Sequence, residues 1–296
     1  MRKKRQRYLF QLGKESDGNR SKQGKQVIMK LCWLTDIHLN FLDANKREQF
    51  YLCLANSHVD LIMIAGDIAD AKSICEILQE MVQILQTPIC FVLGNHDFYH
   101  SQINTVKGRI SELSKQEPLL HWLSQEKHID CGNSTIVIGQ DGWADGRYGD
   151  FNHSTVRLND QKFIYDLRNE AMLGRNHLLR KMQELADEDA FILQQKLDDA
   201  LKNNVKRIYI LTHVPPFEGA SWHEGNISSP DWIPFFTSKA SGDVIINAAT
   251  SYPKIMFEVL CGHTHSAGIY QPRNNLLVKT GKAVYGRPAI QQIFEI

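Results

Sequence analysis

The chain repeats one local pattern: a short apolar run of strand type, then a polar loop, then a segment with helical periodicity. Runs this continuously apolar are typical of strands buried on both faces of a sheet. The pattern therefore predicts an α/β fold whose sheets are covered by helices. The apolar runs span residues 29–35, 59–65, 88–93, 134–139, 205–211 and 255–260, and the helical patterns lie near residues 44–57, 71–86, 101–115 and 188–203. Residues 276–295 depart from this alternation and are typical of short antiparallel strands.

Five of the apolar runs are followed directly by residues that bind metal ions in proteins. The clusters are Asp36-Ile37-His38, Gly66-Asp67-Ile68-Ala69-Asp70, Gly94-Asn95-His96-Asp97, His213, and Gly262-His263-Thr264-His265. Loops at the carboxyl ends of strands are where open α/β sheets place ligands, so we expect the five loops to converge. Any one cluster alone is more typical of a structural turn, and it is the recurrence in equivalent positions that indicates a site.

The five loops offer carboxylate, amide and imidazole donors and no thiolate. This mixture suits Zn, Mn, Fe or Ni better than Ca or Mg. The donors exceed the needs of one tetrahedral site and are enough for two ions that share a bridging carboxylate. They are Asp36, His38, Asp67, Asn95, His213, His263 and His265.

Glycine directly precedes the donors in three loops, at Gly66, Gly94 and Gly262. Because glycine has no Cβ, we expect tight turns and a close approach of the backbone to the site. After Gly262 we expect His263 and His265 to lie in an extended segment, where residues two apart share one face. Each imidazole could then reach a different ion of one compact pair.

In this order, the five clusters resemble the motif set of the calcineurin-like metallophosphoesterase superfamily, over about residues 29–296. The resemblance implies a four-layer α/β/β/α sandwich of two mixed sheets. It also implies a centre of two divalent ions, for which we expect Mn, Fe or Zn, with Mn as the first choice. The reaction it implies is hydrolysis of a phosphate ester by direct attack of a metal-bridging hydroxide, without a covalent enzyme intermediate.

The resemblance also assigns roles to individual residues. The first ion would be held by Asp36, His38 and His265, the second by Asn95, His213 and His263, and Asp67 would bridge the two. His96 would act at the leaving group or on the charge of the phosphate, and Asp97 would orient its ring. Asp70 would have a structural or supporting role.

The substrate is less constrained than the metal chemistry, and both a small phosphodiester and a phosphomonoester fit. For substrate contacts we predict Arg147 and Tyr148, in the Gly-rich loop of residues 139–150, and His223 at the pocket rim. Residues 140–203 would form a cap or side wall. Two alternatives stay open: a scaffold that keeps the fold without catalysis, and a nuclease.

Charge is distributed unevenly along the chain. Residues 1–30 carry +8, because ten Lys and Arg outnumber two acids, so the formal net charge of +1 leaves −7 for the remainder. An acidic body argues against a groove for long nucleic acid, whereas a basic end could attract polyanions. We therefore expect a basic, disordered tail at residues 1–28 and a catalytic domain at residues 29–296, with nucleic acid as a partner only through the tail.

The six cysteines show no ligand-like spacing, which is typical of a reducing compartment rather than of a disulfide framework. The most apolar stretch, residues 59–69, is too short to span a membrane and contains Asp67. We therefore expect a cytoplasmic protein without a membrane span. The sequence leaves its oligomeric state open.

Overall fold

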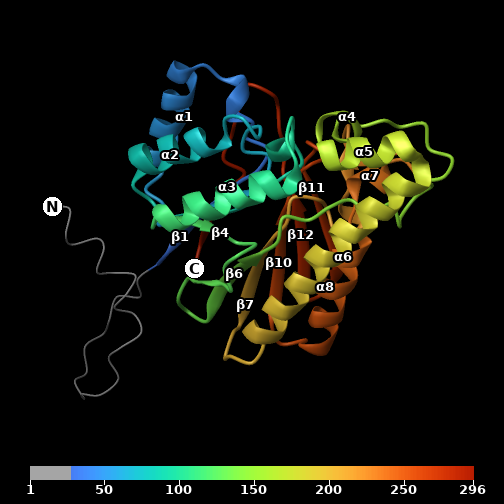
Figure 1. The fold of residues 1–296 in the computed structure, drawn as a ribbon. Helices are drawn as coiled ribbons and strands as arrows, with labels where there is room; N and C mark the ends of the chain where they lie inside the picture. The colour runs from blue at the N-terminus through green and yellow to red at the C-terminus, as the bar shows by residue number, and fades with distance from the viewer. Residues whose placement is uncertain (1–27) are drawn as a thin grey trace, which may run out of the picture.

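The apolar runs form the central strands of two mixed sheets (Figure 1). The structure, a computed structural model, describes residues 28–296. The first sheet has the strand order β13-β1-β2-β3-β4, in which β1 to β4 are parallel and β13 is antiparallel to β1. Its strands are β1 (Lys30–Leu34), β2 (Leu61–Ala65), β3 (Ile89–Val92), β4 (Leu120–Trp122) and β13 (Gln292–Glu295).

The second sheet has the order β11-β12-β10-β7-β6-β5, with parallel central strands and an antiparallel strand at each edge. Its strands are β5 (Ile129–Asp130), β6 (Thr135–Gly139), β7 (Arg207–Leu211), β10 (Met256–Cys261), β11 (Gly268–Arg273) and β12 (Leu276–Thr280). A short hairpin, β8 (Trp222–His223) with β9 (Asn226–Ile227), forms a separate pair.

The strands in the middle of each sheet are mainly apolar because both of their faces are buried. In β1, Leu31 and Trp33 point into the layer between the sheets, where Tyr209 of β7 joins them. Cys32 and Leu34 of the same strand point outward and pack against helices. This alternation supplies two hydrophobic layers from one run of residues.

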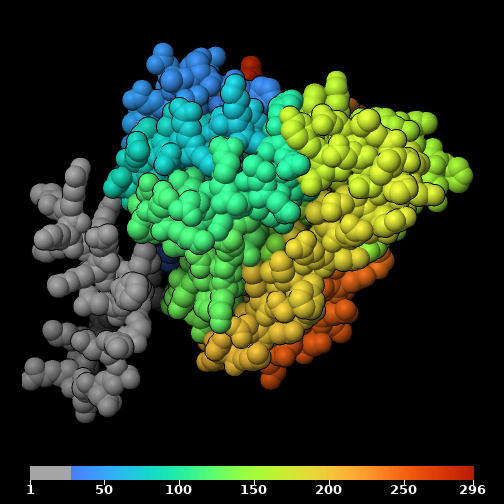
Figure 2. All heavy atoms as spheres, in the orientation of Figure 1, coloured from blue at the N-terminus to red at the C-terminus, as the bar shows by residue number. Residues whose placement is uncertain are grey.

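Helices cover the outer face of each sheet: α1, α2 and α3 pack on the first sheet, and α6 and α8 pack on the second (Figure 1). The four-layer α/β/β/α sandwich is therefore confirmed. Figure 2 shows one face of the molecule, which α3 and α6 cover over much of its length. The helices are α1 (Ala44–Asn56), α2 (Ile74–Leu85), α3 (Ile103–Gln116), α4 (Asp160–Phe163), α5 (Tyr165–Leu173), α6 (Arg175–Ala200), α7 (Ile233–Phe236) and α8 (Lys239–Ser251), with short 3₁₀ turns η1 (Leu39–Phe41), η2 (His96–Phe98) and η3 (Glu218–Ala220).

The structure departs from the expected elements in three places. The helical pattern near residues 188–203 belongs to a longer helix, α6, which already begins at Arg175. Helix α8 is not among the expected helices, because its Gly, Ser, Thr and β-branched residues weaken the helical signal. Strand β12 pairs antiparallel with β11 but parallel with β10, so the expectation of antiparallel strands at the end of the chain was only partly right.

Three further expectations concern the chain as a whole. All six cysteines are free, and Cys32, Cys90 and Cys261 are buried as small apolar residues. Within residues 28–296, no helix combines the length and the apolar character needed to cross a membrane. The basic tail predicted at residues 1–28 lies outside the described residues, apart from Ile28.

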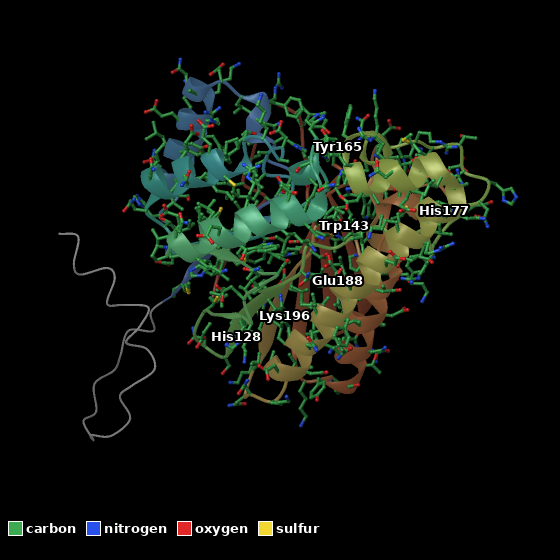
Figure 3. The ribbon with its side chains drawn as sticks, viewed as in Figure 1. His128, Trp143, Tyr165, His177, Glu188 and Lys196 are labelled. Atoms are coloured by element: carbon green, nitrogen blue, oxygen red, sulfur yellow. The ribbon has the colours of Figure 1, made fainter. Side chains whose placement is uncertain are left out.

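A buried lysine fastens α6 to both sheets. Lys196, labelled in Figure 3, donates from Nζ to the carbonyl of Leu123 after β4, to the carbonyl of Gly139 at the end of β6 (2.8 Å), and to Gln140 Oε1 (3.2 Å). Burial lowers the pKa of Lys196 to about 8, against the opposing effect of Asp141. The hydrogen bonds offset part of the cost of burying this cation.

We predict that Lys196→Met destabilises the fold, because three buried acceptors lose their donor. The expected loss in the free energy of unfolding is about 2–4 kcal/mol, measured by urea denaturation. The matched control is Lys202→Met just beyond α6, where the lysine side chain is 73% exposed and should matter little. Equal stability of the two variants would contradict this role for Lys196.

Candidate metal centre

The five predicted loops meet at one edge of the sandwich, at the carboxyl ends of β1, β2, β3, β7 and β10. Backbone hydrogen bonds join the loops directly. The N–H of Asp36 donates to the carbonyl of Gly66 (3.1 Å), and the N–H of Gly262 donates to the carbonyl of His213 (2.9 Å). Each of these bonds links two loops of one sheet, and further contacts described below link the two sheets.

One compact group of donors contains Asp36, His38, Asp67 and His265, whose ligand atoms all lie within 4.8 Å of one another. The Nε2 atoms of His38 and His265 are 3.2 Å apart, so both imidazoles point to the same place. Nε2 of His265 lies 3.3 Å from Asp36 Oδ1. Two carboxylates and two imidazoles with converging atoms form a donor set that fits a divalent ion.

A second group surrounds the amide oxygen of Asn95. This Oδ1 lies 2.9 Å from His213 Nε2 and 2.8 Å from His263 Nδ1. Asp67 faces both groups, because its Oδ1 is 3.4 Å from His213 Nε2 and its Oδ2 is 3.7 Å from His38 Nε2. The structure thus brings all the predicted donors into two adjacent sets with one carboxylate between them.

The two imidazoles of the second group are held from behind by backbone carbonyls. His213 Nδ1 donates to the carbonyl of Ala65 (2.9 Å), and His263 Nε2 donates to that of Phe235 (2.9 Å). Since a carbonyl only accepts, the nitrogen of each ring that faces away from Asn95 carries a proton. The other nitrogen is free to bind a cation, which is the arrangement usual for metal-bound histidines.

The glycines beside the donors leave room for the donor side chains, in agreement with the close backbone approach predicted from the sequence. A Cβ on Gly66 would lie 2.6 Å from His213 Nδ1. A Cβ on Gly94 would collide with Asp67 Oδ1, and one on Gly262 would collide with the carboxylate of Asp36. Backbone therefore packs directly against the donors, where any larger residue would displace them.

Several donors have left-handed backbone conformations, which non-glycine residues seldom adopt. Their φ values are 49° for Asp36, 41° for His38, 54° for Asp67, 70° for His263 and 59° for His265. Each such residue costs about 1–3 kcal/mol, and strain of this kind clusters at functional sites. The expected extended segment of His263 and His265 was therefore wrong: the loop is turned, because the N–H of His263 donates to the carboxylate of Asp36 (2.9 Å).

The centre is strongly charged in the absence of cations. Burial opposes ionisation of Asp36, but His265 and His213 lower its pKa to about 2. Asp67 is equally buried, and His213 holds its pKa well below the usual range. Burial lowers the pKa of His38 to about 4, so its ring is neutral at pH 7. Two buried, ionised carboxylates favour the binding of cations, which must displace a proton from His213, because Asp67 raises the pKa of that ring to about 10 against the effect of burial.

Asp97 does not orient His96, contrary to expectation. Its Oδ1 accepts from the N–H groups of Ile68 and Ala69 (2.9 and 2.8 Å), and its Oδ2 accepts from that of Gly94 (2.8 Å). The carboxylate is fully used in holding the second loop against the third. The ring of His96 is not among its hydrogen-bond partners.

His96 is positioned instead by an aromatic ring and by the shared carboxylate. The ring of His96 stacks on Tyr99 with centroids 4.2 Å apart, and the backbone N–H of His96 donates to Asp67 Oδ1 (2.8 Å). Asp70, expected to be structural or supporting, accepts from the N–H and the hydroxyl of Ser73 at the start of α2. That contact fixes the turn that leads into α2 and lies outside both donor groups.

The predicted substrate residues have different surroundings. Arg147 is paired with Asp145 (3.1 Å) and Asp187 (2.7 Å), so its guanidinium is already committed to two carboxylates. The ring of Tyr148 lies 5.8 Å from the ammonium of Lys239 and contacts none of the donors closely enough to form a hydrogen bond.

His223 alone among the three borders the centre. Its Nδ1 is 3.4 Å from the carbonyl of Thr264, between the two histidines of the last loop. Its ring packs on Phe236, which in turn packs on His263 with both centroid distances 5.3 Å.

Three residues near the centre were missed by the sequence analysis: Tyr99, Asp160 and Tyr285. Asp160 begins α4, and its Oδ1 accepts from Asn95 Nδ2 (2.8 Å) and from the hydroxyl of Tyr99 (2.7 Å). Since Asp160 accepts from the amide nitrogen, the amide oxygen of Asn95 must face the imidazoles. No local signal reveals this role, because Asn159-Asp160 in the sequence has the appearance of an ordinary helix start.

Comparison with known proteins decides the family. The profile of the calcineurin-like phosphoesterases matches residues 29–267, a span that includes every donor of both groups. The chain belongs to this family. It is therefore a metal-dependent phosphoesterase, an enzyme that hydrolyses phosphoric esters, and the two donor groups lie where a centre for two divalent ions is expected.

Solved structures of this calcineurin-like phosphoesterase fold are similar to the chain. A phosphopantetheinyl hydrolase from Mycobacterium tuberculosis has a TM-score of 0.63 at 11% identity, with 90% of this chain and 95% of that chain covered. A dimetal phosphatase from Danio rerio has a TM-score of 0.56 at 11% identity, with 88% and 89% covered. At this identity the likeness establishes the fold alone. No curated protein sequence matches the chain.

We predict that Asp160→Ala weakens the binding of one of two Mn ions by about 10- to 100-fold, because the amide of Asn95 is then free to turn. Isothermal titration calorimetry with Mn measures this without reference to turnover. Asp160→Asn should retain most of the affinity, since an amide oxygen can still accept from Asn95.

The matched control is Asp166→Ala. Asp166 lies on neighbouring α5 and accepts from the N–H of Ile103 (2.8 Å). It therefore joins α5 to the start of α3 without contacting a metal donor. Unchanged Mn affinity in Asp160→Ala, or equal losses in Asp160→Ala and Asp166→Ala, would argue against a positioning role for Asp160.

Proposed function

We propose that the chain hydrolyses a small phosphate ester, either a diester or a monoester, at a centre of two divalent ions. The observation that supports this most directly is the position of Asp67, with one oxygen beside His38 and the other beside His213. Two donor groups joined by one carboxylate suit a pair of ions about 3.5–4 Å apart, which can act together on one phosphoryl group.

In this proposal each ion has its own donors and shares Asp67. Asp36, His38 and His265 hold the first ion, and Asn95, His213 and His263 hold the second. When bound, the ions would supply an activated water and the positive charge that holds the phosphoryl group. Mn, Fe and Zn suit imidazole with oxygen donors, and Mn is the first choice for assays.

His96 is the side chain best placed to act on the substrate itself. Its Nε2 lies 4.0 Å from Asp67 Oδ2, and its side chain is 15% exposed, whereas that of Asp67 is 1% exposed. An imidazole beside the shared carboxylate and partly accessible to solvent can donate a proton to the leaving oxygen, or a hydrogen bond to the phosphate.

We further infer that residues 29–296 form the catalytic domain and that residues 140–203 supply its side wall. Asp160 contacts Asn95 and lines a small cavity together with Trp143 and His263. The charge of −7 outside residues 1–30 favours a small substrate over long nucleic acid. The free cysteines support a reducing compartment such as the cytoplasm.

A turnover screen with Mn tests this function and separates the two substrate classes. Bis(p-nitrophenyl) phosphate represents diesters and p-nitrophenyl phosphate represents monoesters. We expect turnover of at least one, with two Mn ions per chain by inductively coupled plasma mass spectrometry. A chain that binds two ions and hydrolyses no ester would contradict the proposal and favour a non-catalytic scaffold.

We predict that Asp67→Ala loses both ions and nearly all turnover, because it removes the donor that both groups share. Metal content per chain is the primary measurement. Asp198→Ala, which removes an exposed carboxylate from α6, is the control and should keep two ions. Retention of two ions in Asp67→Ala would refute the bridging role.

We predict that His96→Ala keeps its metal content and slows esters with poor leaving groups most. A proton donor matters most where the departing oxygen is most basic, so a plot of log kcat/KM against leaving-group pKa should become steeper. His128→Ala is the control, because His128 (labelled in Figure 3) is exposed and lies between β4 and β5, outside the five loops that carry the donors. An equal loss for all leaving groups would instead assign His96 to the phosphate.

A further inference from the structure

Two exposed aromatic rings adjoin the donor groups. Tyr285 is 49% exposed and Phe41 is 55% exposed, whereas His38, which both rings contact, is 1% exposed. We call these two rings the aromatic shelf. Single exposed aromatic residues are common, but a pair of them beside a charged centre leaves apolar area in water where a ligand must enter.

Tyr285 lies over the imidazoles of the first donor group. Its ring centroid is 4.6 Å from that of His38, 5.1 Å from that of His265 and 6.0 Å from that of His96. Its hydroxyl is 3.5 Å from His96 Nε2. A substituent on a phosphate held at this centre would therefore have a path along the ring of Tyr285.

A tight turn presents Tyr285 to the centre. The N–H of Arg287 donates to the carbonyl of Val284 (3.0 Å), and Gly286 has a φ of 73°, which is the pattern of a type II turn with glycine in its third position. Tyr285 occupies the second position, at the tip. The turn belongs to the loop between β12 and β13, and the exposed cations Lys282 and Arg287 flank Tyr285 on that loop.

Phe41 reaches the same place from the first donor loop. It ends η1, three residues after His38, and its centroid is 5.0 Å from that of Tyr285 with an angle of 60° between the rings. The edge of Phe41 thus borders the ring of Tyr285 at an inclined angle. One backbone segment carries both Phe41 and the donors Asp36 and His38, so the position of Phe41 relative to the centre is set by that segment.

We propose that the aromatic shelf of Phe41 and Tyr285 binds a planar aromatic substituent of the phosphate ester, either a nucleobase or an aryl group. This inference rests on the proposed function for the placement of the phosphate. Stacking on an aromatic side chain tolerates different bases because each has a π face. The ester would be held at two points, by its phosphate at the donor groups and by its ring on the shelf.

Binding of phosphonates to the Mn-loaded chain tests the proposal without turnover, because their C–P bond is not hydrolysed. Calorimetry would compare two matched pairs. Phenylphosphonate against methylphosphonate reports an aryl group, and the phosphonate analogue of AMP against that of ribose 5-phosphate reports a nucleobase. We expect the ring-bearing member of at least one pair to bind about 5- to 100-fold more tightly. The pair with the larger difference identifies the source of the ring.

Variants assign the difference to the shelf. Tyr285→Ala and Phe41→Ala should each reduce the advantage of the ring-bearing ligand several-fold and leave the affinity of the ring-free ligand unchanged. Tyr285→Phe keeps the ring without the hydroxyl and should preserve the advantage. Tyr252→Ala is the control, because Tyr252 is an exposed tyrosine (41%) at the end of α8 and should alter neither affinity. Thermal unfolding of each variant checks that it is folded.

Two results would overturn the proposal: equal affinity within both ligand pairs for the wild type, or a folded Tyr285→Ala that loses both members of a pair equally. Neither result bears on catalysis, which the turnover screen measures separately. Turnover of esters without tighter binding of ring-bearing ligands would contradict only the binding role of the aromatic shelf. Tighter binding of ring-bearing ligands without turnover of any ester would contradict only the proposed function.

Discussion

Everything at the candidate centre depends on one buried carboxylate that faces two sets of donors. Asp67 is 1% exposed, and its two oxygens point separately to the side of His38 and to the side of His213. A charge so deeply buried is costly unless cations or hydrogen bonds compensate for it. The neighbouring imidazoles and the N–H of His96 provide that compensation in the protein, and two divalent ions would provide more.

The arrangement of the two sheets places this carboxylate beside its partners. The carboxyl ends of strands from both sheets share one edge, so loops distant in sequence become neighbours there. Asp97 then joins the second loop to the third through three backbone N–H groups, and glycines let the chain approach the donors. The left-handed backbone of Asp36 and His263 is part of the cost of this convergence, and the surrounding hydrogen bonds maintain it.

The features predicted correctly from the sequence are those set by local sequence pattern, and the features missed are contacts that only the packing of the fold creates. Apolar runs located the strands, and the residues after them located the donors, because each signal lies within a few positions. The partners of Asp97, the ion pairs of Arg147 and the contact of Asp160 with Asn95 join residues far apart in the chain, and no periodicity reports them. Tyr285 was missed for a related reason: Val284-Tyr285-Gly286-Arg287 reads as an ordinary turn, and only the fold places that turn above His38.

The central claim is that two ions share Asp67, and anomalous diffraction from crystals of the Mn-loaded chain tests it most directly. The account predicts two anomalous peaks per chain. One should be bound by Asp36, His38 and His265, the other by Asn95, His213 and His263, with Asp67 contacting both. A single peak, or two peaks of which only one contacts Asp67, would contradict the account.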